Sequence, residues 1–242
     1  MRRFYAPPAR FQGEVVQLSP EETQHLARVL RLGVGARVEV CNGRGHNWEA
    51  VVASLHPDGA LLQTVRPLPA WGESPLHLIL GIGQAKGEAL DEVIRQAVEM
   101  GVKQIIPFVS ERSERPAAGR TARRLGRWQR LAQESLKSCQ RSFLPEIALP
   151  QDFTAVLKTP AEVKLIFWEE ERAGGLHSCL NRPRPASACL LIGPEGGFAA
   201  GEVELARQAG FQVASLGPRR LKVATAALAA LTLLQYAWGD LP

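Results

Sequence analysis

The chain has 242 residues, which is enough for one large domain or two smaller ones, and its 45% hydrophobic content is ample for a packed core. No apolar run approaches the roughly twenty residues of a membrane span, and the charged N-terminus lacks the apolar stretch of a signal peptide. The four cysteines are scattered and the five histidines lack metal-ligand spacing. We therefore expect a cytoplasmic protein with reduced thiols, no membrane segment and no metal.

The first part of the chain is predicted to be mostly β. The ranges Arg37 to Cys41, Asn47 to Ala53 and Ala60 to Val65 have strand-like patterns. Short strands separated by turn-rich segments favour a small β-barrel. Near residues 67–75, three prolines and a glycine predict a linker. The sequence thus predicts two domains, residues 1–70 and 75–242.

One helix interrupts the predicted strands. It begins at the capping box Ser19-Pro20-Glu21-Glu22 and is expected to end at Gly33. The helical period places Leu26, Val29 and Leu30 on one side of this helix, and His25, Arg28 and Arg31 on the other. The second side is basic, and Arg2 and Arg3 add to the positive charge of the same domain.

Strands and helices alternate after the linker. Strands are predicted at Leu76 to Ile82, Val102 to Val109, Val163 to Trp168, around Leu190 and at Phe211 to Leu216. Helices are predicted at Gly87 to Met100, Thr121 to Gln140, Gly201 to Gln208 and Ala224 to Trp238. Such alternation indicates an α/β domain with a parallel sheet covered by helices on both faces.

The segment from Glu111 to Arg141 concentrates the positive charge. Its acidic residues are Glu111, Glu114 and Glu134, and its basic residues are Arg112, Arg115, Arg120, Arg123, Arg124, Arg127, Arg130, Lys137 and Arg141. Arginine binds phosphate through its planar fork of donors. A solvated helix face and a polyanion-binding surface both explain this composition.

Two apolar runs end abruptly in glycine-containing loops: Leu191-Ile192-Gly193-Pro194-Glu195-Gly196-Gly197-Phe198 and Leu216-Gly217-Pro218-Arg219. Glycines at the carboxyl ends of parallel strands expose main chain where open α/β sheets bind ligands. Simple tight turning is the alternative. The Gly193 loop lacks the GxGxxG spacing, and the separate Gly81 to Gly87 segment is not a Walker A loop, but two paired glycine loops favour a pocket built from backbone.

These residues resemble the 16S rRNA uracil-N3 methyltransferase family of the SPOUT class. Further matches are Arg2-Arg3-Phe4, His25 to Arg31, Lys86-Gly87, Glu99-Met100-Gly101-Val102, Ser110-Glu111-Arg112-Ser113 and Pro145-Glu146-Ile147. The resemblance covers nearly the whole chain. It implies an N-terminal PUA-like RNA-binding barrel and a C-terminal α/β domain with a deep trefoil knot. It also implies a homodimer that uses S-adenosyl-L-methionine to methylate one uridine in the decoding region of 16S rRNA, within the 30S subunit.

The resemblance also assigns roles to residues. The cofactor-binding set is Leu191, Ile192, Gly193, Pro194, Glu195, Gly196, Gly197, Leu216, Gly217, Leu221, Lys222, Thr225 and Ala226. Candidate RNA contacts are Arg2, Arg3, Arg28, Arg31 and Arg112. Because N3 must lose a proton, a nearby cation would stabilise the resulting anion, and Arg141 and Lys222 are the catalytic candidates.

The chain departs from the family pattern in two places. Where the family reads Leu-Arg-x-Glu-Thr-Ala, the chain has Lys222 and Ala224 in place of the arginine and the glutamate. Before Arg141, the family's Glu-Gln-Ser is replaced by Lys137-Ser138-Cys139. Two alternatives therefore stay open: a SPOUT methyltransferase with another rRNA target, and a non-catalytic RNA-binding protein of ribosome assembly.

Overall fold

The computed structural model describes residues 1–56, 58–85, 88–113, 120–171 and 175–242. It divides into two compact units, which comprise residues 1–73 with 133–144 (unit 1) and residues 74–132 with 145–242 (unit 2). The segment 133–144, which the sequence analysis placed in the second domain, therefore belongs to unit 1. Lys86-Gly87 of the family pattern, and Glu114 and Arg115 of the basic segment, lie outside the described residues.

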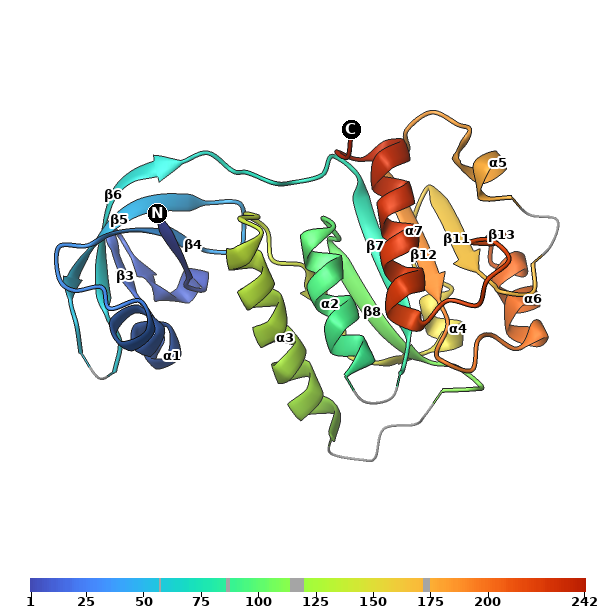
Figure 1. Ribbon diagram of the computed structural model, residues 1–242, viewed down its shortest axis with the longest axis horizontal. Helices are drawn as coiled ribbons and strands as arrows, with labels where there is room; N and C mark the ends of the chain where they lie inside the picture. The colour runs from blue at the N-terminus through green and yellow to red at the C-terminus, as the bar shows by residue number, and fades with distance from the viewer. Residues whose placement is uncertain (57, 86–87, 114–119, 172–174) are drawn as a thin grey trace. The chain divides into compact units, whose positions relative to one another are not determined.

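Unit 1 is built on one six-stranded sheet (Figure 1). Its strands lie in the order β1 (Arg2–Tyr5), β4 (Arg37–Cys41), β5 (Asn47–Ser54), β6 (Leu61–Leu68), β3 (Val15–Gln17) and β2 (Phe11–Gln12). Only the β1–β4 pairing is parallel among them. The three longer strands confirm the predicted ranges closely. The sequence analysis missed β1, β2 and β3, because strands of two to four residues are too short to show alternation.

The helical segment of unit 1 differs from its prediction. Ser19 caps α1 (Pro20–Gln24) by accepting a hydrogen bond from the Glu22 amide, as predicted. The chain then continues as a π-helical turn, η2 (His25–Val29). Its longer repeat shifts the side chains, so Leu26 is buried whereas Val29 is 65% exposed. The helix ends at Val29 with Leu30 as its C-cap, and not at Gly33, and Arg31 follows with a φ of 55°.

Unit 2 contains a seven-stranded sheet in which all the pairings are parallel. The strand order is β10 (Gln151–Asp152), β8 (Gln104–Val109), β7 (His77–Gly83), β12 (Ser187–Ile192), β11 (Val163–Phe167) and β13 (Gln212–Ala214), and β9 (Glu146–Ile147) pairs with β8. Residues of the central strands are almost entirely buried, as expected for a sheet covered on both faces. The predicted parallel α/β architecture is confirmed.

Helices cover both faces of this sheet (Figure 1). The helices α2 (Ala89–Glu99) and α7 (Val223–Trp238) pack against each other, and α4 (Phe153–Val156) and α6 (Ala200–Gln208) lie on the opposite face. The remaining helices are α3 (Arg120–Ser138), α5 (Leu176–Leu180) and, in unit 1, the short 3-10 turn η1 (Pro8–Arg10). The described residues contain no helix suited to crossing a membrane.

Gln235 of α7 joins α7 to the end of α2. Its side-chain amide donates to the Met100 carbonyl at 2.6 Å and accepts from the Ser74 hydroxyl at 2.7 Å, in a site where Gln235 is 1% exposed. Gly101 ends α2 with a φ of 78°, and a Cβ there would come within 2.6 Å of the Gln235 amide nitrogen. The glycine is required both by the backbone conformation and by this close approach.

The four cysteines are free thiols. Three of them are buried, and desolvation raises the pKa of Cys189, in the middle of β12, to about 12. Cys189 therefore remains a neutral core residue at physiological pH. Within the described residues, no cluster of three histidine, cysteine or acidic side chains has a metal-binding arrangement.

Candidate functional site

Unit 2 contains a cavity of about 1070 Å³ at the carboxyl ends of three neighbouring strands. Phe167, Trp168 and Glu169 line it from the end of β11, Ile192 to Phe198 from the end of β12, and Ser215 to Gly217 from the end of β13. The first turn of α7 and one side of α2 complete the wall. This is the position at which open α/β sheets bind ligands.

The β12 loop is tightly packed against its surroundings. A Cβ on Gly193 would lie 3.2 Å from the Phe198 ring, and one on Gly196 would lie 3.0 Å from the Arg112 Cβ. Gly197 adopts a φ of 68° and closes a turn by donating its amide to the Pro194 carbonyl at 2.9 Å. These glycines keep the loop compact, so they place its main chain beside the cavity.

The β13 loop presents bare main chain in a different way. Gly217 has a φ of 103°, and a Cβ at this position would meet nothing within 4 Å. Its amide donates to the Ser215 hydroxyl at 3.2 Å. The loop therefore borders the cavity with backbone that no side chain covers.

Positive charge gathers where the β13 loop leads into α7. Arg219, Arg220 and Lys222 line the cavity, are exposed, and form no ion pair within the described residues. Lys222 is also the N-cap of α7, and its side chain accepts no hydrogen bond from the helix. Because the first amides of an uncapped helix carry partial positive charge, this end of the cavity suits an anionic group.

The cavity brings together most of the residues predicted to bind the cofactor. Those that line it are Ile192, Gly193, Pro194, Glu195, Gly196, Gly197, Leu216, Gly217, Leu221, Lys222 and Ala226. Leu191 and Thr225 do not line it. Leu191 points into the core cluster of unit 2, and Thr225 lies on an exposed part of α7.

Other lining residues were missed by sequence reasoning. Trp168 is the last residue of a predicted strand and Glu169 follows it, so their position at a strand end is the signal that could have found them. Glu88, the N-cap of α2, and Glu92 and Arg95 of α2 line the cavity. Nothing in the sequence distinguishes these α2 residues from a solvated helix face, because only the packing of α2 brings them to the cavity.

The predicted RNA contacts have different surroundings. Arg2, Arg28 and Arg31 are exposed on unit 1. Arg112 is exposed on unit 2, and its guanidinium donates to the Gly196 carbonyl at 3.1 Å, so it also braces the β12 loop. Arg3 does not fit its predicted role. Its side chain is 5% exposed, lies 3.3 Å from Glu39 and donates to the Asn47 side chain, so it is a structural residue of the sheet.

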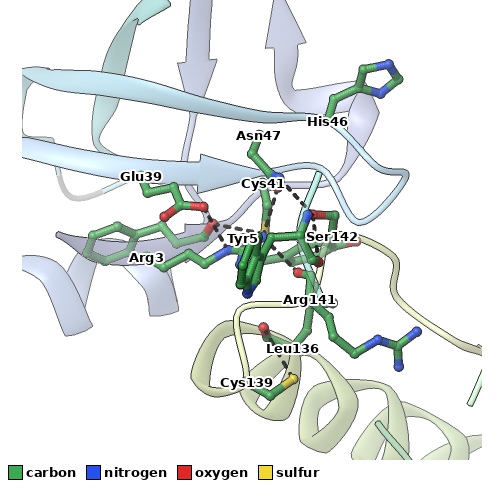
Figure 2. Close-up of polar contacts among 12 residues, drawn as sticks. Arg3, Tyr5, Glu39, Cys41, His46, Asn47, Leu136, Cys139, Arg141 and Ser142 are labelled. Atoms are coloured by element: carbon green, nitrogen blue, oxygen red, sulfur yellow. Dashed lines mark hydrogen bonds and ion pairs between the residues drawn. The ribbon is translucent and has the colours of Figure 1, made fainter. Parts of the chain in front are cut away.

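Arg141 belongs to a polar network inside unit 1 (Figure 2). Its carbonyl accepts from the Arg3 guanidinium at 2.7 Å, and the Asn47 amide donates to the neighbouring Ser142 hydroxyl at 2.7 Å. The Arg141 guanidinium points away from Arg3 and Asn47 in Figure 2 and pairs with Glu73 at 3.0 Å. Arg141 is 2% exposed, so its charge is buried and already compensated. Lys222 is the one catalytic candidate that lines the cavity.

Comparisons with known proteins identify the family of this chain. Residues 72–235 match the family model described as RNA methyltransferase domain, and residues 18–65 match the RNA methyltransferase PUA domain. A ribosomal RNA small subunit methyltransferase E from Synechocystis sp. is 33% identical over 95% of this chain and 75% of that protein. The chain belongs to this methyltransferase family.

Two solved structures support the same relationship. A ribosomal RNA small subunit methyltransferase E from Neisseria gonorrhoeae, bound to S-adenosyl methionine, has a TM-score of 0.90 and 31% identity and covers 100% of both chains. A putative methyltransferase from Legionella pneumophila, also in complex with this cofactor, has a TM-score of 0.91 and 31% identity over 99% of this chain and 98% of the other. The family members thus share the fold of both units.

Proposed function

We propose that this chain transfers a methyl group from S-adenosyl-L-methionine to N3 of one uridine in the decoding region of 16S rRNA, within the 30S subunit. The observation that carries the proposal is the cavity, because it gathers the two glycine loops and Lys222 in a chain that belongs to a methyltransferase family. The remaining parts of the proposal come from the family resemblance of the motifs.

The residues of the cavity fit the cofactor. Bare main chain at Gly217 lets a flat adenine approach backbone donors and acceptors. The cationic end, with Arg219, Arg220 and the first amides of α7, suits the carboxylate of the methionine part. The volume of about 1070 Å³ lies at the upper limit for small-molecule sites, roughly 300–1,000 Å³, so it leaves room for a base beside the cofactor.

The bound cofactor supplies an electrophilic methyl group on its sulfonium. The protein's contribution is then mainly orientation, because an in-line displacement needs the base nitrogen and the methyl carbon aligned. The two glycine loops hold one reactant in a fixed place. Lys222, whose ammonium has no ion-pair partner among the described residues, stabilises the negative charge that develops on the uracil as the N3 proton leaves.

RNA binding is assigned to the exposed arginines. Arg2, Arg28 and Arg31 on unit 1, and Arg112 on unit 2, present guanidinium groups to the phosphate backbone. The family resemblance further predicts a homodimer, a trefoil knot in unit 2 and a cytoplasmic location, and all three stay predictions.

Mass spectrometry of 16S rRNA tests the proposed function. Cells that lack the gene should lose one N3-methyluridine, and the unmodified gene should restore it. Purified 30S subunits from the deletion strain should accept a methyl group in vitro from the purified protein. Loss of a different methylated nucleotide would show another rRNA target, and no loss at all would favour a non-catalytic role in ribosome assembly.

A further inference from the structure

Glu169 occupies a distinctive position in the cavity of unit 2. It follows β11 by two residues, lines the cavity and is half-buried. A Cβ on Gly197 would overlap one of the Glu169 carboxylate oxygens. The absence of a side chain at Gly197 is therefore what allows the carboxylate to lie against the β12 loop.

The other acidic residues of the cavity already have partners. Glu88 pairs with Arg127, Glu92 accepts from Gln96, and Glu195 is also engaged. Within the described residues, Glu169 forms neither an ion pair nor a hydrogen bond. A half-buried carboxylate without a hydrogen-bond or ion-pair partner loses part of its hydration, and no protein contact compensates for this loss. Such a group is well suited to bind a ligand.

An ionised carboxylate only accepts hydrogen bonds, and its two oxygens suit two adjacent donors. The ribose of the cofactor offers such a pair in its vicinal hydroxyls. In dinucleotide-binding sheets, an acidic residue takes a ribose hydroxyl in the same way. The ammonium of the methionine part is the competing ligand. This ammonium is bonded to the carbon that carries the cofactor's carboxylate. Arg219, Arg220 and the first amides of α7 attract that carboxylate, and the ammonium with it, to the cationic end of the cavity.

We propose that Glu169 binds the ribose of the cofactor, with its carboxylate accepting hydrogen bonds from the two hydroxyls and Gly197 providing the space. This inference rests on the proposed function only in taking S-adenosylmethionine as the ligand of the cavity. It adds a residue that recognises the nucleoside half of that ligand.

Isothermal titration calorimetry provides the test, with S-adenosylhomocysteine and with 5′-methylthioadenosine, which keeps the adenine and ribose but lacks the amino acid. Glu169→Gln removes the charge and one acceptor at constant shape. We expect both affinities to fall by a similar factor, on the order of 10-fold, because hydrogen bonds to charged groups are the strong ones. Glu170→Gln, at the exposed neighbouring residue, is the matched control and should bind both ligands normally.

A second measurement needs no substitution. The unmodified protein should bind the 2′-deoxy analogue of 5′-methylthioadenosine more weakly than the parent compound, and this difference should shrink in Glu169→Gln. Equal binding of the two compounds by the unmodified protein would overturn the inference. A loss for S-adenosylhomocysteine alone would overturn it too and assign Glu169 to the ammonium. If the unmodified protein bound none of these ligands, the cofactor of the proposed function would be wrong as well.

Discussion

Gly193 is a single residue on which the shape of the cavity wall depends. It stands where β12 ends, and a Cβ at this position would lie only 3.2 Å from the Phe198 ring, so a larger side chain would force the ring or the loop to move. We predict that Gly193→Val abolishes S-adenosylhomocysteine binding, because the branched side chain would displace the wall of the cavity or occupy the place of the adenosine. Calorimetry measures the effect. Gly201→Ala, at a helical glycine with open space around it, should bind normally, and near-normal binding by Gly193→Val would mean that the cofactor lies elsewhere.

Lys222 is expected to contribute to the rate of methyl transfer but not to the affinity for the cofactor. We predict that Lys222→Ala lowers the rate of methyl transfer on the order of 10²-fold while cofactor affinity stays nearly intact, because the charge it stabilises develops only in the transition state. Lys222→Arg, the residue typical of the family, should keep or raise the rate. Single-turnover methylation of 30S subunits measures both variants. A normal rate for Lys222→Ala would reduce this lysine to a surface charge.

At the scale of elements, the helical segment of unit 1 carries its arginines on an exposed surface. Arg28 lies in η2 and Arg31 follows it, and neither forms an ion pair within the described residues. We predict that Arg28→Ala with Arg31→Ala weakens RNA binding and flattens its salt dependence by roughly one unit of slope per lost phosphate contact. Filter binding at several salt concentrations measures the slope.

The matched control removes two positive charges from unit 2 instead. Arg182 and Arg184 are exposed, and their double alanine variant changes net charge equally. This control should leave the slope close to that of the unmodified protein. If the two double variants had the same slope, overall charge and not the helical segment of unit 1 would account for the effect.

The junction of α2 and α7 tests how a buried polar group stabilises unit 2. Gln235→Leu keeps the volume but removes the hydrogen bond that the Met100 carbonyl accepts and the one that the Ser74 hydroxyl donates. We predict a loss of about 1–3 kcal/mol in the free energy of unfolding, the usual cost of unsatisfied buried groups. Thermal unfolding measures it. Gln129→Leu, on the exposed side of α3, should have little effect, and equal stability of the two variants would show that the junction contributes nothing.

The whole molecule consists of two compact units, and the cavity is lined by residues of unit 2. We predict that S-adenosylhomocysteine slows hydrogen exchange mainly in residues 192–198 and 215–226. Ligand at 100 times its Kd should stabilise the unit that binds it by about 2.7 kcal/mol. Amides of β4, β5 and β6 should change little. Protection spread equally over the strands of unit 1 would contradict the assignment of the site to unit 2 alone.

The sequence by itself determined the alternation of elements, the parallel sheet of unit 2 and most of the lining of its cavity. It could do so because buried parallel strands are continuous apolar runs, and because glycines after two such runs mark strand ends that meet at one edge. Gly193, Gly197 and Gly217 were found in this way, whereas Lys222, the N-cap of α7, was identified from the family resemblance.

Only the tertiary structure decided which charged side chains are free of internal ion pairs and so available to bind a ligand or RNA. Arg3 and Arg141 look like any other arginine in the sequence, yet Glu39 and Glu73 neutralise them inside unit 1. The π-helical turn likewise moved Val29 to the surface, since a local change of helical repeat leaves no periodic signal. Glu169 became a candidate ligand-binding residue only when the structure placed it against Gly197. The pairing of a charge depends on contacts between residues distant in sequence, which no local pattern records.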